Sequence, residues 1–177
     1  MDKFRTLNAD EIDVRVATVS AKGISLLLYK DARCDMNILD ETVGPMGWTR
    51  HHSRDNANCT VSIWDEEKAM WISKEDTGSE SFTEKEKGLA SDSFKRACFN
   101  WGIGRELYTA PFIWIKASDC NIEESGEYQG KKKYTCRDSF YVSQIFYDEK
   151  RQIVALAINN SKTRKNVFAF GNKPKSN

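Results

Sequence analysis

Two adjacent cations, Lys95 and Arg96, stand inside an apolar repeat, in the stretch KGLASDSFKRACFNWGIGREL at residues 87–107. On a helical wheel of about 100° per residue, one arc predicts a core face; it collects Ala90, Phe94, Ala97, Cys98 and Trp101. Lys95 and Arg96 fall on the other side, with Phe99 between them. A solvated face would explain the cations alone, but an aromatic ring between two cations favours a partner surface. We therefore predict one face that packs and one that binds phosphate.

Gly102 and Gly104 follow this helix, and Arg105 comes directly after them. Two close glycines permit left-handed backbone and the close approach of a ligand. A phosphate-binding glycine loop precedes a helix and uses the positive end of its dipole, whereas these glycines come after one. That interpretation is therefore excluded by their order.

The sequence contains no legible catalytic arrangement. Its acidic clusters, Asp10-Glu11-Asp13 and Asp65-Glu66-Glu67, fall at an expected helix start and in a turn, where acids are common. The five cysteines form no C-x-x-C pair and indicate free thiols. His51 and His52 are adjacent, so they would point to opposite sides of a strand. We predict a protein that is not an enzyme and holds no cofactor or metal.

Charge is distributed unevenly along the 177 residues, although the net charge is only +1. From Lys150 to Asn177 there are seven Lys/Arg and no Asp/Glu, so the rest of the chain carries an excess of acids. A basic tail on an acidic body indicates an anionic partner, with a solvated terminus as the alternative. No apolar run approaches the roughly 18 residues of a membrane span. We expect no membrane association and a cytoplasmic protein.

Apolar spacing predicts an α+β fold, with helices first and antiparallel strands later. Asn8 and Glu11 have capping-box spacing, and the apolar residues after them predict a helix that Gly23 ends. A second helix begins near Tyr29 and stops at Gly44-Pro45. Short strands are predicted at 48–53, 59–64 and 69–74, followed by a third helix that Thr83-x-x-Glu86 opens.

The remainder of the chain is predicted to be mostly extended. The run APFIWI, residues 110–115, is an apolar strand, and residues 121–133 are predicted to be a polar loop. The segments YVSQIFY and QIVALAI form a hairpin around a charged turn, and VFAF is a last strand. In the loop, Tyr128 and Lys131-Lys132-Lys133 are candidates for a nucleic-acid contact, with a solvated loop as the alternative.

Three segments in order resemble the Rad fifty-two (Rad twenty-two) family of single-strand annealing proteins, in its compact bacterial or prophage form. The helix around Ser91, Phe94, Lys95-Arg96-Ala97 and Trp101-Gly102 is similar to the family's central helix. The segment YKDARCDMNILDETVGPMGW is similar to its early helix, and the hairpin before KEDTGSES to the strands that lead into the central helix. The match covers roughly residues 7–115, and the last sixty or so residues match nothing in the family.

The resemblance implies a β-β-β-α annealing core at residues 1–118: an antiparallel sheet packed on a central helix. Residues 119–177 would be a C-terminal β-hairpin extension with a basic tail, within the same domain. Such a core assembles into a ring with single-stranded DNA in an outer positive groove. By position, Lys95 and Arg96 match the family's DNA-contacting pair, and Arg33 lies near a second contact. The complete predicted DNA-binding set is Lys95, Arg96, Arg33, Lys30, Arg105 and Lys85.

We therefore expect single-stranded DNA binding and the annealing of complementary strands, in recombination and repair, by a homo-oligomer. A host single-strand-binding protein is a candidate partner, and the expected location is the nucleoid of a bacterial host. The alternative is a protein-interaction adaptor that binds no nucleic acid. Such an adaptor would use Phe99 and the hairpins as its surface. For Trp64, Trp71, Phe82, Phe112 and Trp114, the alternatives are core packing and subunit contact.

Overall fold

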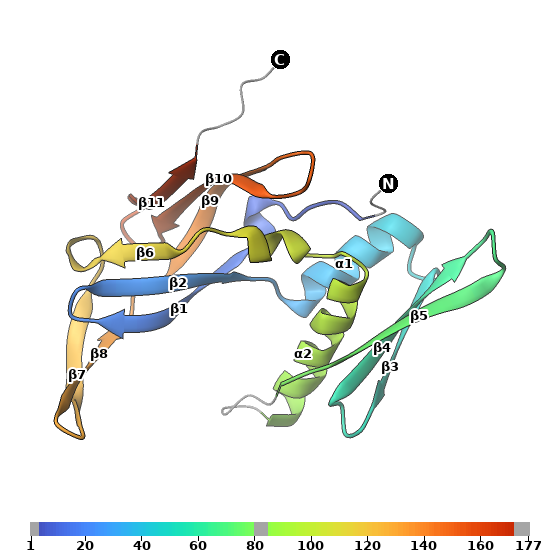
Figure 1. Ribbon diagram of the computed structural model, residues 1–177, viewed down its shortest axis with the longest axis horizontal. Helices are drawn as coiled ribbons and strands as arrows, with labels where there is room; N and C mark the ends of the chain where they lie inside the picture. Colours follow the sequence, from blue (N-terminus) through green and yellow to red (C-terminus); the bar gives the residue numbers. More distant parts are fainter. Residues whose placement is uncertain (1–3, 80–84, 172–177) are drawn as a thin grey trace, which may run out of the picture. The chain divides into compact units, whose positions relative to one another are not determined.

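A computed structural model describes residues 4–79 and 85–171, without the side chains of residues 85–87. Its contacts divide the chain into two compact units (Figure 1). Unit 1 comprises Met1–Thr6 and Lys30–Arg105, and unit 2 comprises Leu7–Tyr29 and Glu106–Asn177. The chain thus passes from one unit to the other near residues 6, 29 and 105. The fold is α+β, and the paired strands are antiparallel.

Unit 1 is a three-stranded sheet with two helices. The sheet has the order β3 (Trp48–Ser53), β4 (Asn58–Asp65), β5 (Met70–Thr77). Helix α2 (Lys85–Asn100) packs on β4 and β5, and α1 (Ala32–Val43) packs against α2. The predicted strands and both of these helices are therefore confirmed, in the order helix, strand, strand, strand, helix.

Side chains of β4 and α2 form the core of unit 1. Val61 and Cys59 of β4 are fully buried, as are Phe94, Ala97 and Cys98 of α2. Alternation along the strand and the helical repeat bring these two apolar faces together.

Both ends of α1 follow signals in the sequence. The Asp31 carboxylate accepts a hydrogen bond from the Cys34 backbone N–H (2.8 Å) and caps the first turn. At the other end Gly44, with φ of 75°, donates its N–H to the Asp40 carbonyl. Only glycine adopts this backbone without strain, so the helix ends where the Gly-Pro pair predicts.

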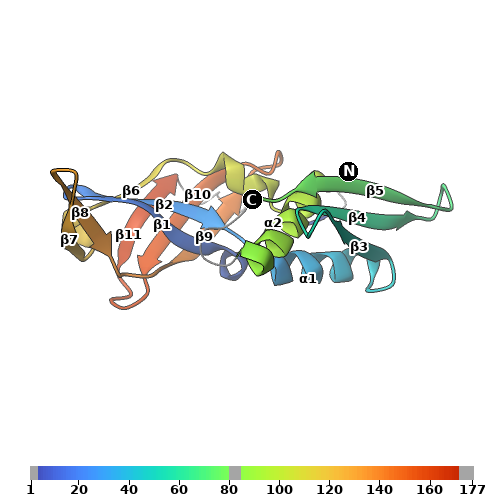
Figure 2. The ribbon, with the colours of Figure 1, turned by 90° about the horizontal axis from the view of Figure 1, so that it is seen from below.

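Unit 2 is built on a six-stranded sheet of order β11-β10-β9-β1-β2-β6. Its strands are β1 (Asp13–Ser20), β2 (Gly23–Tyr29), β6 (Ile113–Lys116), β9 (Phe140–Tyr147), β10 (Ile153–Asn160) and β11 (Asn166–Gly171). The sheet curls until its edge strands β6 and β11 come into contact (Figure 2). The predicted strand at APFIWI, the hairpin β9–β10 and the last strand are confirmed. The curled sheet encloses an apolar interior that includes Ile24, Ile113, Ile115 and Ile158.

Two predictions for unit 2 are wrong. The predicted first helix is only a short 3₁₀ turn, Ala9–Glu11, and the chain then runs as β1. The capping box does form, because the Glu11 carboxylate accepts the Asn8 N–H (2.8 Å). Valines at positions 14, 16 and 19 favour extended backbone, and the segment pairs with β2 from Asp13 to Ser20. The polar loop predicted at 121–133 is instead a hairpin of β7 (Ile122–Tyr128) and β8 (Lys131–Cys136).

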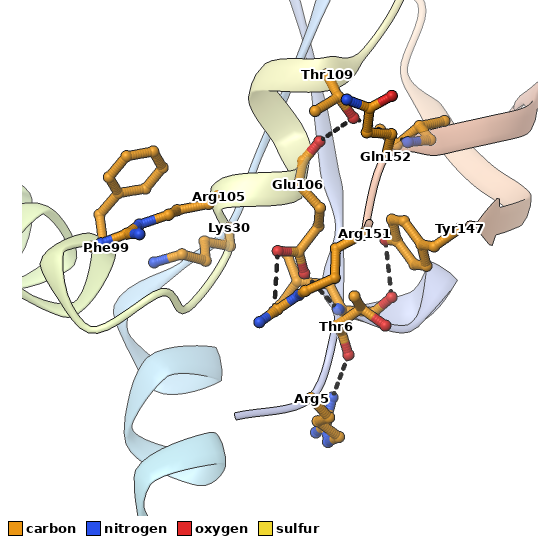
Figure 3. A network of polar contacts seen from close by, with 12 residues as sticks. Arg5, Thr6, Lys30, Phe99, Arg105, Glu106, Thr109, Tyr147, Arg151 and Gln152 are labelled. Carbon is orange, nitrogen blue, oxygen red and sulfur yellow. Dashed lines mark hydrogen bonds and ion pairs between the residues drawn. The ribbon is translucent and has the colours of Figure 1, made fainter. Parts of the chain in front are cut away.

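A buried carboxylate joins distant segments of unit 2 (Figure 3). Glu106 lies in the 3₁₀ helix Arg105–Thr109 and is 2% exposed. It accepts the Leu7 N–H (2.7 Å) and forms an ion pair with Arg151 (3.4 Å). The Tyr147 hydroxyl donates to the Leu7 carbonyl (2.9 Å), and burial raises the pKa of this tyrosine. The segment that leads into β1 is therefore held by the hydrogen bonds that Leu7 makes with the buried Glu106 and with Tyr147.

Candidate nucleic-acid interface

Helix α2 has the two faces that its sequence predicts. Phe94, Ala97 and Cys98 are 0% exposed against the sheet, whereas Lys95 is partly exposed and Arg96 lies at the surface. The predicted core arc is thus confirmed for its central members. Because its buried face packs against the sheet, α2 holds the backbone of the two cations in place.

Carboxylates of the protein compete only weakly with an external anion for these two cations. Arg96 pairs with Asp92 one turn earlier at 3.2 Å, and its side chain is 48% exposed. An exposed pair of this kind contributes little free energy, so phosphate can replace the carboxylate. Within the described part of the chain, Lys95 forms no hydrogen bond or ion pair through its ammonium group. It is close enough to α1 to act on the carboxyl of Asp35.

Lys30, a predicted DNA contact, is buried instead. It is 7% exposed and forms a buried ion pair with Asp35, which is 0% exposed. The other oxygen of Asp35, Oδ2, is buried with no hydrogen bond among the described residues. Burial raises the pKa of Asp35 to about 6, while the charges of Lys30 and Lys95 oppose that rise. A lysine in this position supports the fold and is not available to phosphate at the surface.

Lys30 also explains the second glycine after the central helix. A Cβ atom on Gly104 would come within 2.3 Å of the Lys30 Cε, and the φ of Gly104 is 78°. The close approach that this glycine permits is therefore by an internal side chain. Gly102 (φ 95°) has open space around it and reverses the chain after α2. A ligand is not needed to explain either glycine.

Arg105, another predicted DNA contact, caps the end of α2. Its guanidinium donates to the carbonyls of Phe99 (2.7 Å) and Asn100 (2.8 Å) and lies over the Phe99 ring at 5.7 Å. Lys74 of β5 donates to the same Asn100 carbonyl (2.9 Å). Positive groups at this negative end of the helix dipole stabilise it. Phe99 is thus covered by Arg105 and is less open than the wheel indicates.

Arg33 and Lys85 are the remaining predicted contacts. Arg33 is at the second position of α1, with its side chain 84% exposed, and it pairs with Asp31 at 2.9 Å. Like Arg96, it can exchange this partner for phosphate. Lys85 is the first residue of α2, but its side chain lies outside the described residues.

Arg50 of β3 is a surface cation beside α2 that the sequence analysis missed. Its guanidinium lies over the Phe94 ring at 5.0 Å, and Trp48 stacks on the same ring at 6.0 Å. The signal was present in WTRHH, because alternate residues of a strand face the same way. Arg50 adds a cation to the side of α2 that carries its buried aromatic ring.

A groove of about 540 Å³ in unit 1 has the opposite electrostatic character. Its lining includes the apolar residues Val43, Ile63 and Ile72 and the acidic residues Asp65, Glu66 and Glu67. Three carboxylates repel a polyanion, so this groove does not extend the cationic surface of α2.

The β7–β8 hairpin of unit 2 replaces the predicted polar loop, and its three lysines on β8 are balanced by three glutamates on β7. Lys133 lies over the Tyr128 ring at 4.6 Å, and Lys132 pairs with Glu124 at 2.9 Å. One lysine is thus neutralised by a carboxylate and another is held against an aromatic ring.

Among the described residues, no helix is both long and apolar enough to pass through a bilayer. Comparisons with models of protein families, with curated proteins and with solved structures find no match to this chain. The resemblance seen in the sequence accordingly stays a prediction.

Proposed function

We propose that the protein binds single-stranded DNA through its phosphate backbone and anneals complementary strands. The single observation that carries this proposal is the Lys95-Arg96 pair on α2, with Lys95 partly exposed and Arg96 exposed, on a helix where Phe94, Ala97 and Cys98 are fully buried. The order of β3, β4, β5 and α2 supports it, since it is the order that the family resemblance implies. Arg33 and Arg50 are further surface cations of the same unit.

Annealing requires no covalent chemistry, so a site made of cations is sufficient. Each phosphate contact releases condensed counterions and lowers the repulsion between two strands. Contacts to the backbone read no sequence and leave the base edges free to pair. A surface of lysine and arginine that contacts phosphates fits this task.

A ring or other oligomer would provide the affinity that one protomer lacks. A few cations bind a strand weakly, but copies that share one strand gain by multivalency. The edge strands β3 and β5 pair only with β4 within the described residues, so each has a free side for pairing with another copy. A net charge near zero is compatible with this proposal, because the groove needs only local positive charge.

The test replaces both cations of α2, as Lys95→Ala with Arg96→Ala. We expect weaker binding to all single-stranded sequences alike and loss of annealing. The slope of log K against log salt should become shallower by about 1.4, the value for two lost phosphate contacts on a single strand. Binding is measured by fluorescence anisotropy over a salt series, and folding by circular dichroism.

The matched control removes two exposed cations from turns, as Lys68→Ala with Lys150→Ala, and should leave the salt slope unchanged. Wild-type annealing by the α2 double variant would contradict the proposed site. A wild-type protein that binds no single strand at any salt concentration would support the adaptor alternative.

A further inference from the structure

Unit 2 exposes apolar side chains on the outer face of its curled sheet. Leu27 of β2 is 47% exposed, Phe112 just before β6 is 77% exposed, and Trp114 of β6 is 37% exposed. Their neighbours Ile113 and Ile115 are at most 2% exposed, because alternate residues point into the sheet. We call Leu27, Phe112 and Trp114 the outer aromatic face. It lies on the adjacent strands β2 and β6 (Figure 1).

The two rings of this face lie side by side, and Trp114 packs against the neighbouring strand. Phe112 and Trp114 stack with centroids 6.3 Å apart and an angle of 18° between their planes. The indole also lies against Gly23 of β2, where a Cβ atom would come within 2.8 Å of the Trp114 ring. The indole can therefore pack in this position only because Gly23 has no side chain. Two nearly parallel rings on a rigid strand form a preorganised stacking surface.

Unpaired cations flank the same face. Arg15 of β1 is directly opposite Leu27 in the β1–β2 register, and Lys116 follows Trp114 by two residues, so both point outward. Within the described residues neither side chain forms an ion pair. By contrast, Arg96, Lys132 and Arg151 all have carboxylate partners. Asp13, opposite Tyr29, is the acid that β1 contributes to this outer face.

We propose that the outer aromatic face is a second binding site for single-stranded nucleic acid, which stacks bases on Trp114 and Phe112. Arg15 and Lys116 contact the adjoining phosphates. Exposed aromatic rings with flanking cations suit this ligand, because every base has an apolar face and every linkage a negative charge. A protein segment would pair with the two cations only if it carried acidic residues at the right places, whereas a nucleic-acid strand carries a phosphate at every linkage. The charge therefore favours a polyanion.

This second site differs in chemistry from the proposed surface of α2. The cations of α2 respond to phosphates alone, whereas the outer aromatic face requires bases. A strand without bases separates the two contributions. The second site can therefore fail while the first stands, and the reverse also holds.

The experiment compares an oligothymidylate with an abasic strand of equal length, by anisotropy at constant salt. The wild-type protein should prefer the strand with bases. Phe112→Ala with Trp114→Ala should weaken oligothymidylate binding at least about tenfold, the factor expected from one lost base stack, and leave abasic binding unchanged. Trp114→Phe keeps a ring and should retain most of the preference. Lys95→Ala with Arg96→Ala should weaken both strands equally.

Two further variants make the result decisive. Trp71→Ala removes a tryptophan of similar exposure (42%) from unit 1 and should not change the preference for bases. Arg15→Ala with Lys116→Ala leaves the rings in place and should make the salt slope shallower by about 1.4. Equal wild-type affinity for both strands would overturn the proposal. So would a loss of oligomer mass in the Trp114 variants with base preference intact, which would assign the face to a protein contact.

Discussion

At the scale of single residues, the same charged side-chain types have opposite roles in unit 1. Lys30 lies inside, paired with Asp35, and Lys95 is partly exposed with no ion-pair partner in the described part of the chain. Breaking a buried ion pair typically costs about 3–5 kcal/mol, because one charge is left without compensation. Replacing a surface cation changes stability by only about 0.5 kcal/mol. Substitutions at Lys30 would therefore report on folding, and substitutions at Lys95 on binding.

The carboxyl of Asp35 should titrate above its ordinary value of 3.8, with a midpoint at about 6, because burial disfavours its charged form. The folded state then holds this proton more tightly than the unfolded chain. The contribution of Asp35 to stability is therefore full below about pH 4 and is lost as the pH rises through about 6. Carbon-13 NMR of the carboxyl group measures the midpoint, and Asp35→Asn removes the signal. A midpoint below 3.8 would show that the charge of Lys30 outweighs burial.

At the scale of elements, the end of α2 is fixed from two directions. Lys74 comes from β5 and Arg105 from the segment after the helix, and both donate to the Asn100 carbonyl. Terminal carbonyls lack partners inside a helix, so these bonds satisfy groups that would otherwise need water. The cations of α2 thus stand on a helix that is capped as well as packed.

Arg105→Ala should destabilise unit 1 by about 1 kcal/mol, because it removes two hydrogen bonds and a favourable charge at the helix end. Urea unfolding followed by circular dichroism measures the change. Arg54→Ala removes an exposed arginine from the β3–β4 turn and should stay within about 0.5 kcal/mol of wild type. The salt slope of DNA binding should be unchanged by Arg105→Ala. A shallower slope with unchanged stability would restore Arg105 to the DNA-binding set.

At the scale of the whole molecule, two units carry different surfaces. Unit 1 has the cations of α2, and unit 2 has the outer aromatic face with Arg15 and Lys116. Each surface is small, since a single protomer offers only a few phosphate contacts or one pair of stacked rings. The proposed binding of single strands would therefore reach useful affinity only by repetition of these surfaces along one strand.

Multi-angle light scattering should accordingly find a species of many protomers, with or without DNA. Pairing of β3 of one copy with β5 of the next would be a head-to-tail contact, which forms a ring when the rotation between copies closes. The Lys95→Ala with Arg96→Ala variant should keep the same mass, because its substitutions lie on α2 and not on a sheet edge. A clean monomer under both conditions would contradict the proposed ring.

Sequence patterns alone determined the elements whose signals are local. Gly44-Pro45 ends α1 as predicted, and the periods of apolar residues give β3, β4, β5, α2 and the β9–β10 hairpin. Each of these elements is specified by residues a few positions apart, because the direction of a side chain depends on the periodicity of the backbone. The two faces of α2 follow for the same reason. The predicted ring, DNA binding and family remain proposals that these patterns suggested.

Tertiary structure decided the features that depend on residues far apart in the chain. Residues 13–20 have apolar spacing that fits a helix, but pairing with β2 makes them a strand. The sequence predicts Lys30 and Arg105 as surface cations that bind DNA. In the structure Lys30 is buried in an ion pair with Asp35, and Arg105 stays at the surface but donates hydrogen bonds to the last carbonyls of α2. The outer aromatic face arises because β2 and β6 are adjacent, although more than 80 residues separate them. Burial and strand pairing join distant segments, and no local pattern specifies which segments meet.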